Sequence, residues 1–152
     1  MKRVLLTGMS ATGKSTVIGE LAARGYRAID TDHDGFTAWT GTEWLWREDR
    51  IQRLLAADDA EALFLSGCTR NQVSFYPRLD HVILLSAPVP VIVERLATRT
   101  TNGYGKHPDE LAEILLFQQT VEPLLRAGAS LEVDTSAPLD EVIATILAHA
   151  GL

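Results

Sequence analysis

A short glycine-containing stretch near the N-terminus constrains this chain more than any other feature. It reads Gly8-Met9-Ser10-Ala11-Thr12-Gly13-Lys14-Ser15, fits the Walker A pattern G-x-x-x-x-G-K-[ST], and is followed by Thr16. It follows the apolar run 4–6 and precedes a segment with helical periodicity, which is the context in which such a stretch cradles phosphate groups. The glycines permit backbone angles and close approaches that a side chain would block. Successive N–H groups at a helix start then form an anion-binding nest, so we predict a phosphate-binding loop.

The residues of this loop have distinct predicted roles in nucleotide binding. Lys14 supplies a mobile positive charge for the β- and γ-phosphates, and the hydroxyl of Ser15 is placed to ligate Mg²⁺. The alternative is a glycine-rich turn with a surface lysine, but the pattern and its context together favour the phosphate loop. The predicted nucleotide-binding residues here are Gly8, Ser10, Ala11, Thr12, Gly13, Lys14, Ser15 and Thr16.

Composition excludes several other classes of protein. The 152 residues are the length of one domain, and we expect residues 1–152 to form a single one. A net charge of -6 disfavours a nucleic-acid partner, and one cysteine excludes an internal disulfide framework. Apolar runs fall short of the roughly 18 residues that a membrane span needs, and the apolar N-terminal run is too short for a signal peptide. We expect a soluble, cytoplasmic protein that does not bind membranes.

Short apolar runs alternate with helical patterns along the chain. Continuous apolar runs suit strands that are buried on both faces of a parallel sheet. The alternation predicts an α/β fold, a three-layer sandwich around a five-stranded parallel sheet, with ligands at the carboxyl ends of the strands. The predicted strands are 4–6, 26–29, 62–65, 82–85 and 131–133, and the predicted helices are 16–24, 43–57, 89–99, 108–127 and a last one with Ser136 as N-cap.

Acidic residues follow the second predicted strand and not the third or fourth. Nucleotide-hydrolysing motors usually end an apolar strand in Asp, but residues 63–65 and 82–85 are followed by serine. Asp30 and Asp32 alternate along an extended segment and therefore share one face. Beside a phosphate loop, we expect Asp30 to support the metal and Asp32 to orient or deprotonate a substrate hydroxyl. The alternative is that these acids only cap a loop or the next helix.

These elements resemble the small P-loop kinases of the nucleoside-monophosphate-kinase superfamily, in particular the shikimate-kinase and gluconate-kinase-like branch. The resemblance is carried by residues 8–16, by Asp30-Thr31-Asp32, and by two arginines before a short polar loop. It implies the P-loop NTPase fold, a substrate-binding helical segment at about 35–60 and a mobile lid at about 99–107. The chain departs from shikimate kinases at residues 66–70, which stand where those enzymes carry a run of glycines.

Arg95 and Arg99 precede the predicted lid and share one helix face at i, i+4 spacing. A mobile loop that carries an arginine can close over ATP and offset charge on the transferring phosphoryl group. We assign this catalytic role to Arg99, which lies nearer the loop, and nucleotide binding to Arg95. The alternative is a solvated helix end with arginines at its negative pole.

All three tryptophans lie between residues 39 and 46. One interpretation is a pocket in which an aromatic face stacks on a planar or sugar group while arginines hold an anion. The alternative is that Trp44 packs the helix onto the core and the other two tryptophans shield a loop. The predicted substrate residues are Asp32, Trp39, Trp44, Arg47, Arg50, Gly67 and Arg70.

The pattern as a whole predicts an ATP-dependent kinase, a transferase that moves the γ-phosphoryl group to a small-molecule acceptor bearing a hydroxyl or a phosphate. The predicted catalytic residues are Lys14, Asp32 and Arg99, and the predicted Mg²⁺ residues are Ser15 and Asp30. The alternatives are a nucleotide-binding switch or an accessory ATPase without an acceptor. The sequence leaves the acceptor open among hydroxy acids, sugars, nucleosides, nucleotides and antibiotics.

Overall fold

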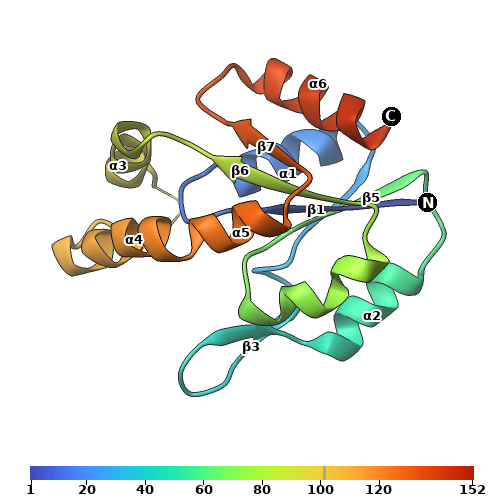
Figure 1. Ribbon diagram of the computed structural model, residues 1–152, viewed down its shortest axis with the longest axis horizontal. Helices are drawn as coiled ribbons and strands as arrows, with labels where there is room; N and C mark the ends of the chain where they lie inside the picture. Colours follow the sequence, from blue (N-terminus) through green and yellow to red (C-terminus); the bar gives the residue numbers. More distant parts are fainter. Residues whose placement is uncertain (101) are drawn as a thin grey trace.

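A five-stranded parallel sheet in the order β2-β5-β1-β6-β7 forms the centre of the protein (Figure 1). The computed structural model describes residues 1–100 and 102–152. All five predicted apolar runs lie in or overlap these strands, so the predicted fold class is confirmed. The strands are β1 (Lys2–Thr7), β2 (Arg27–Asp30), β5 (Ala62–Ser66), β6 (His81–Ser86) and β7 (Leu131–Asp134).

Helices cover both faces of the sheet, which explains why its central strands are continuously apolar. Helices α1 (Lys14–Ala23) and α6 (Leu139–Ala150) pack on one face, where Leu6 and Phe64 are fully buried (Figure 1). Helix α2 (Glu48–Ala56) and the 3-10 helix η1 (Arg70–Arg78) pack on the other face, against Leu5, Leu63 and Leu65. Because successive strand residues point to opposite faces, strands β1, β2, β5 and β6 contribute to both cores.

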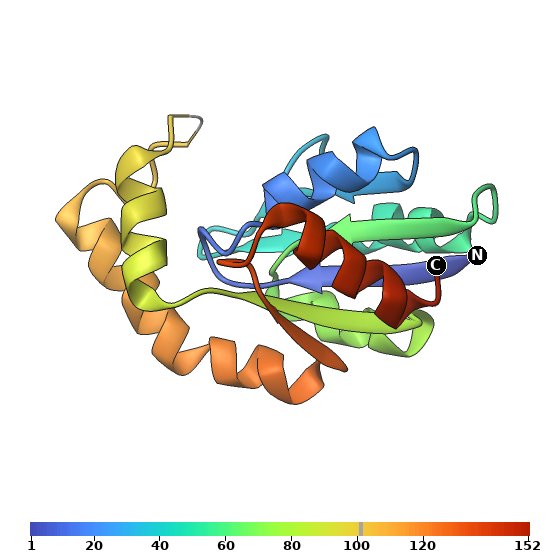
Figure 2. The same cartoon turned by 90° about the horizontal axis from the view of Figure 1, so that it is seen from above.

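Helices α3 (Val89–Thr98) and α4 (Pro108–Thr120) stand together beyond the carboxyl edge of the sheet (Figure 2). They share a small apolar cluster that includes Ile92, Leu96 and Ile114. The pair therefore borders the edge where the phosphate loop lies. Among the described residues, no helix is both long enough and apolar enough to cross a membrane.

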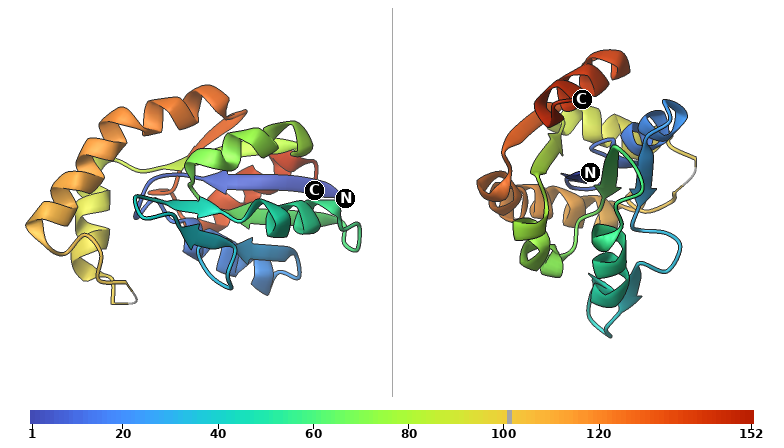
Figure 3. Two further views of the ribbon diagram at one scale, coloured as in Figure 1. Left: turned by 90° about the horizontal axis from the view of Figure 1, so that it is seen from below. Right: turned by 90° about the vertical axis from the view of Figure 1, so that its right-hand side faces the viewer.

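The predicted helix 43–57 is wrong in its first part. Residues Thr37–Trp39 (β3) and Trp44–Trp46 (β4) form an antiparallel hairpin, and the helix begins only at Glu48 (Figure 3). Gly41, with a φ of 103°, sits in the turn between the strands, a conformation that favours glycine. Trp44, Leu45 and Trp46 are consecutive apolar residues, so no apolar–polar alternation distinguished this strand from a helix.

Two further helix boundaries differ from the prediction. The predicted helix 108–127 is broken at Val121 into α4 and α5 (Glu122–Gly128), because Pro123 has no N–H for the helical hydrogen bond and its ring crowds the preceding turn. Ser136 is not the N-cap of α6, which is Pro138. The Ser136 hydroxyl instead donates to the Asp134 carboxylate, at 2.6 Å.

Candidate active site

The phosphate loop joins β1 to α1 in a shape that depends on two glycines. A Cβ at Gly8 would lie 2.4 Å from the Leu85 carbonyl oxygen, so only glycine fits against β6. Gly13 adopts a φ of 96°, which L-residues rarely adopt. Ala11, with a φ of 63°, takes the left-handed conformation without being glycine. The loop geometry required for phosphate binding is therefore built into the backbone.

Thr135, just after β7, fastens the loop to the opposite side of the site. Its hydroxyl donates to the Thr12 carbonyl oxygen at 2.7 Å. Arg95 reaches the same point from α3, donating to the Thr135 carbonyl at 2.8 Å and to the Ala11 carbonyl at 3.0 Å. Arg95 thus lies against the loop and partly buried, not on the solvated helix end that the alternative supposed.

Lys14 folds over the loop that precedes it. Its Nζ donates to the carbonyl oxygens of Gly8, at 2.6 Å, and Met9, at 3.0 Å. Burial lowers the pKa of Lys14, while the nearby carboxylates of Asp32 and Asp30 act to raise it. A cationic amine, two carboxylates and a nest of N–H groups therefore share one small region at the sheet edge.

Asp30 connects β2 to the start of α1. The Ser15 hydroxyl donates to Asp30 Oδ2 at 3.0 Å, and the backbone N–H of Asp32 donates to Asp30 Oδ1 at 3.0 Å. The chain turns directly after Asp30, and Asp30 Oδ1 caps this turn by accepting from the Asp32 N–H. The loop-capping alternative is therefore correct for this one oxygen. Desolvation raises the pKa of Asp32, and the charge of Asp30 raises it further. A carboxylate with a raised pKa is a better proton acceptor than an ordinary one.

Ser66 supplies an unused hydroxyl beside this pair. It is buried at the carboxyl end of β5, opposite Asp30 in the sheet register, and its Oγ has no hydrogen-bond partner among the described residues. Phe64, two residues earlier, packs on the α1 side of the sheet, so the Ser66 side chain also points to that side. The hydroxyls of Ser15 and Ser66 and the carboxylate of Asp30 form a set of hard oxygen donors, the type that Mg²⁺ prefers.

A cavity of about 570 Å³ lies between the loop, the end of α3 and the start of α6. It brings together six of the predicted nucleotide residues of the loop with Asp32, Arg95 and Arg99, and its far end is apolar. Its lining comprises Ser10, Ala11, Gly13, Lys14, Ser15, Thr16, Val17, Asp32, Arg95, Thr98, Arg99, Asn102, Thr135, Ala137, Leu139 and Val142.

Arg99 lines this cavity but is held within the predicted lid. Its Nε donates to the Asn102 carbonyl oxygen at 3.0 Å, and its Nη2 donates to the Tyr104 carbonyl oxygen. Partial burial lowers the pKa of Arg99 from its ordinary value. The side chain nevertheless stays charged, because arginine is not deprotonated in proteins. Residue 101 of the predicted lid lies outside the described residues.

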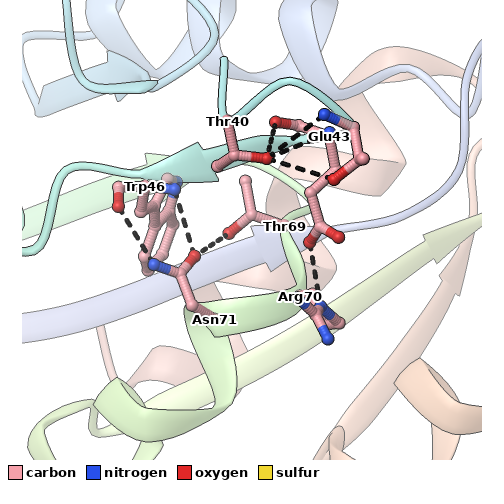
Figure 4. Close-up of polar contacts among 7 residues, drawn as sticks. Thr40, Glu43, Trp46, Thr69, Arg70 and Asn71 are labelled. Carbon is pink, nitrogen blue, oxygen red and sulfur yellow. Dashed lines mark hydrogen bonds and ion pairs between the residues drawn. The ribbon is translucent and has the colours of Figure 1, made fainter. Parts of the chain in front are cut away.

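The other predicted substrate residues do not line this cavity. Trp39 and Trp44 lie on the hairpin with ring centroids 5.7 Å apart, and they are 55% and 60% exposed. Arg70 pairs with Glu43 at the hairpin turn, with 2.8 Å between Nε and Oε1 (Figure 4). Arg50 donates weakly to the Asp34 carbonyl, at 3.4 Å, and the exposed Arg47 lies just after β4.

Gly67 and Cys68 occupy the end of β5 beside the hairpin. A Cβ on Gly67 would lie 2.4 Å from Thr31 Oγ1 and 3.2 Å from Trp46 Nε1, so glycine allows these side chains to approach. Burial raises the pKa of the Cys68 thiol, although the charge of Lys14 opposes the shift. The thiol is therefore protonated at neutral pH, which argues against a nucleophilic role.

Sequence reasoning missed several residues of this site. Thr135 follows β7 directly and lies two residues after the predicted strand 131–133, so the rule that placed Asp30 and Asp32 at a strand end would also have found it. The apolar end of the cavity, formed by residues 137–142, has no motif. Trp46, and not Trp44, is the tryptophan that packs into the core, against Phe75.

Comparison with known proteins places this fold in a defined class, the P-loop domains. The family model described as AAA domain matches residues 4–116. The chain belongs to this family. No match was found among curated proteins.

Solved structures of small kinases resemble this fold over nearly its whole length. Shikimate kinase from Acinetobacter baumannii, in complex with shikimate, is 19% identical, with a TM-score of 0.70 and coverage of 99% of this chain and 94% of that one. Shikimate kinase from Bacteroides thetaiotaomicron is 18% identical, with a TM-score of 0.68 and coverage of 99% of both chains. A gluconokinase from Sinorhizobium meliloti 1021 is 22% identical, with a TM-score of 0.64 and coverage of 99% and 91%. The predicted resemblance to this branch is confirmed as a likeness of fold.

Proposed function

We propose that this protein transfers the γ-phosphoryl group of ATP to a small-molecule acceptor. The observation that carries this proposal is that one cavity joins the phosphate loop to Lys14, Asp32 and Arg99. The structural neighbours, which include shikimate kinases and a gluconokinase, support the same class of reaction. We propose a single domain, 1–152, with an acceptor segment at about 35–60 and a lid at about 99–107.

The loop and its surroundings suit Mg²⁺ and the phosphates of ATP. Ser15 and Asp30 would hold the ion. The Ser66 hydroxyl, which has no partner in the described part of the chain, would be a further oxygen donor or a partner for a bound water. When bound, Mg²⁺ neutralises charge on the phosphate oxygens. Lys14 would leave its carbonyl partners for the β- and γ-phosphates, and the N–H groups of the loop would hold the remaining oxygens.

Asp32 and Arg99 would act on the transferring group. Asp32 would orient an acceptor hydroxyl and take its proton, which its raised pKa favours. If the acceptor group is already a phosphate, Asp32 would only position it. Arg99 would exchange its two lid carbonyls for the transferring phosphoryl group as the lid closes. Arg95 would stay against the loop and bind the nucleotide from its present position.

The acceptor would bind on the hairpin side of Asp32, outside the nucleotide cavity. Trp39 and Trp44 expose a continuous aromatic surface there, suited to a ring-shaped or planar acceptor. Arg47, Arg50 and Arg70 would supply positive charge around it. Gly67 would contribute indirectly, by leaving room for the Thr31 and Trp46 side chains to approach each other.

A coupled ADP-release assay across a metabolite panel tests this proposal. Turnover that depends on an acceptor supports the kinase, and turnover without one indicates an ATPase. Tight ATP binding with neither indicates the nucleotide switch. The Lys14→Ala variant serves as the control, because it removes the amine that would bind the phosphates and should leave the fold unchanged.

A further inference from the structure

One buried hydrogen bond joins the hairpin to the segment that carries the two acids. The indole Nε1 of Trp46 in β4 donates to Thr31 Oγ1 at 2.8 Å, and both residues are buried. The Thr31 hydroxyl donates in turn to the Ser66 carbonyl oxygen at 2.7 Å, beside the bond from the Thr31 backbone N–H to the same oxygen, at 3.0 Å. Thr31 lies between Asp30 and Asp32, so this chain of bonds fixes the residue that separates the proposed Mg²⁺ residue from the proposed catalytic carboxylate.

Trp46 is itself fixed from a second direction. The Asn71 side chain at the start of η1 pairs with the Trp46 backbone, accepting from its N–H and donating to its carbonyl, both at 3.0 Å (Figure 4). The Trp46 ring packs edge-on against Phe75 of the same helix, with centroids 5.7 Å apart. Asn71 thus fixes the backbone position from which the indole reaches Thr31, while Phe75 only packs against the ring.

Packing alone does not require this arrangement. A buried indole N–H and a buried hydroxyl must each find a partner, and a phenylalanine and a valine would fill similar space without that need. The bond joins segments 15 residues apart in the chain, and Gly67 provides the room for it. The network therefore restricts where the Asp30–Asp32 turn can lie relative to the loop.

We propose that Trp46, held by Asn71, is a positioning residue that fixes Asp32 for phosphoryl transfer through Thr31. This inference rests on the proposed function. Trp46 shares its hairpin face with Trp39 and Trp44, so an acceptor that binds those rings would contact the same rigid element that orients Asp32. Displacing a reacting group by about 1 Å costs on the order of 100-fold in rate, so the hydrogen bond matters more to kcat than to ligand binding.

Four variants test this role in the acceptor-dependent assay. Trp46→Phe keeps the ring and removes the N–H, and Thr31→Val keeps the shape and removes the hydroxyl. Each should lower kcat by about 10- to 100-fold while KM for ATP stays within about twofold. Thr31→Ser keeps the hydroxyl and should retain most of the activity. Phe75→Leu is the matched packing control: it should lower Tm and leave kcat close to the wild-type value.

A second readout does not depend on turnover. Backbone hydrogen exchange in residues 30–32 should accelerate in Trp46→Phe and Thr31→Val, and not in Phe75→Leu, because only the first two break the tether. Should the wild type transfer phosphate while both tether variants keep its kcat, or should Phe75→Leu lose kcat equally, the positioning role is wrong. A wild type that phosphorylates no acceptor on the panel instead refutes the proposed function, and the positioning role with it.

Discussion

Adding one methyl group at Gly8 should distort the phosphate loop. In Gly8→Ala, the new Cβ would lie 2.4 Å from the Leu85 carbonyl oxygen and 2.6 Å from Thr12 Oγ1. The Leu85 carbonyl belongs to β6, which is paired on both sides by β1 and β7, and it cannot retreat without disturbing the sheet. Overpacking of this kind costs about 1–3 kcal/mol. At about 2–4 °C per kcal/mol for a domain of this size, Tm should fall by roughly 2–12 °C.

Gly19→Ala provides the matched control. Gly19 lies inside α1, and a Cβ there would meet nothing within 4 Å. Alanine favours a helix interior over glycine by about 0.5–1 kcal/mol, so Tm should rise by roughly 1–4 °C. The same methyl group thus has opposite effects at two positions 11 residues apart.

Thermal unfolding followed by circular dichroism, with ATP titration by calorimetry, measures both effects. Gly8→Ala should also lose ATP affinity, since its loop N–H groups no longer converge, while Gly19→Ala should bind ATP like the wild type. A Gly8→Ala protein that melts at the wild-type temperature and binds ATP normally would refute the loop geometry described above.

Four other outcomes follow from the site and its surroundings. Lys14→Ala should lower kcat by about 100-fold or more with little change in Tm, and near-normal turnover would exclude Lys14 from the mechanism. Asp32→Asn should lower transfer to a hydroxyl by about 10²–10⁴-fold with ATP affinity retained, as calorimetry can check. Arg99→Ala should lower kcat far more than ATP affinity, because its phosphate contact forms on lid closure; equal losses would contradict this. The hydrogen bond from Arg126 lowers the pKa of Glu132, so Glu132 stabilises the fold above its ordinary pKa of 4.5 and loses this effect as the pH falls. Melting curves measured at pH values above and below 4.5 should show that Tm falls more steeply with acid in the wild type than in Glu132→Gln.

The sheet and the phosphate loop could be predicted because their signals are local. Strands of a parallel sheet are buried on both faces, so each one is visible in the sequence as a short continuous apolar run. The phosphate loop needs glycine at positions 8 and 13 for reasons of backbone geometry, so its sequence and its shape are tied together. Its place after β1 then locates the carboxyl edge of the sheet and with it Asp30 and Asp32.

The hairpin could not be predicted in the same way, because contacts distant in the sequence stabilise it. The backbone of Trp46 is paired by the Asn71 carboxamide, 25 residues later, and Glu43 at the turn is paired by Arg70. Any helix propensity of residues 43–47 is too weak to compete with these contacts, because tertiary structure overrides propensity. The break at Val121 differs, because Pro123 was visible in the sequence and its effect on the helix could have been foreseen.

Strand pairing also decides which tryptophan is buried, and this bears on function. Trp39 pairs with Trp44, and Trp46 lies two residues further along the same strand, so all three rings share one face of the hairpin. Only Trp46 is near enough to the sheet to be covered, and the other two continue its aromatic surface into solvent. Isolated exposed aromatics are common, but two adjacent exposed tryptophans that pack on each other leave a larger apolar surface open to solvent. One end of this aromatic face of the hairpin is bonded to Thr31, and the other end exposes the rings of Trp39 and Trp44. This arrangement suits the proposed role of the hairpin, which would bind an acceptor at the exposed end and orient Asp32 at the buried end.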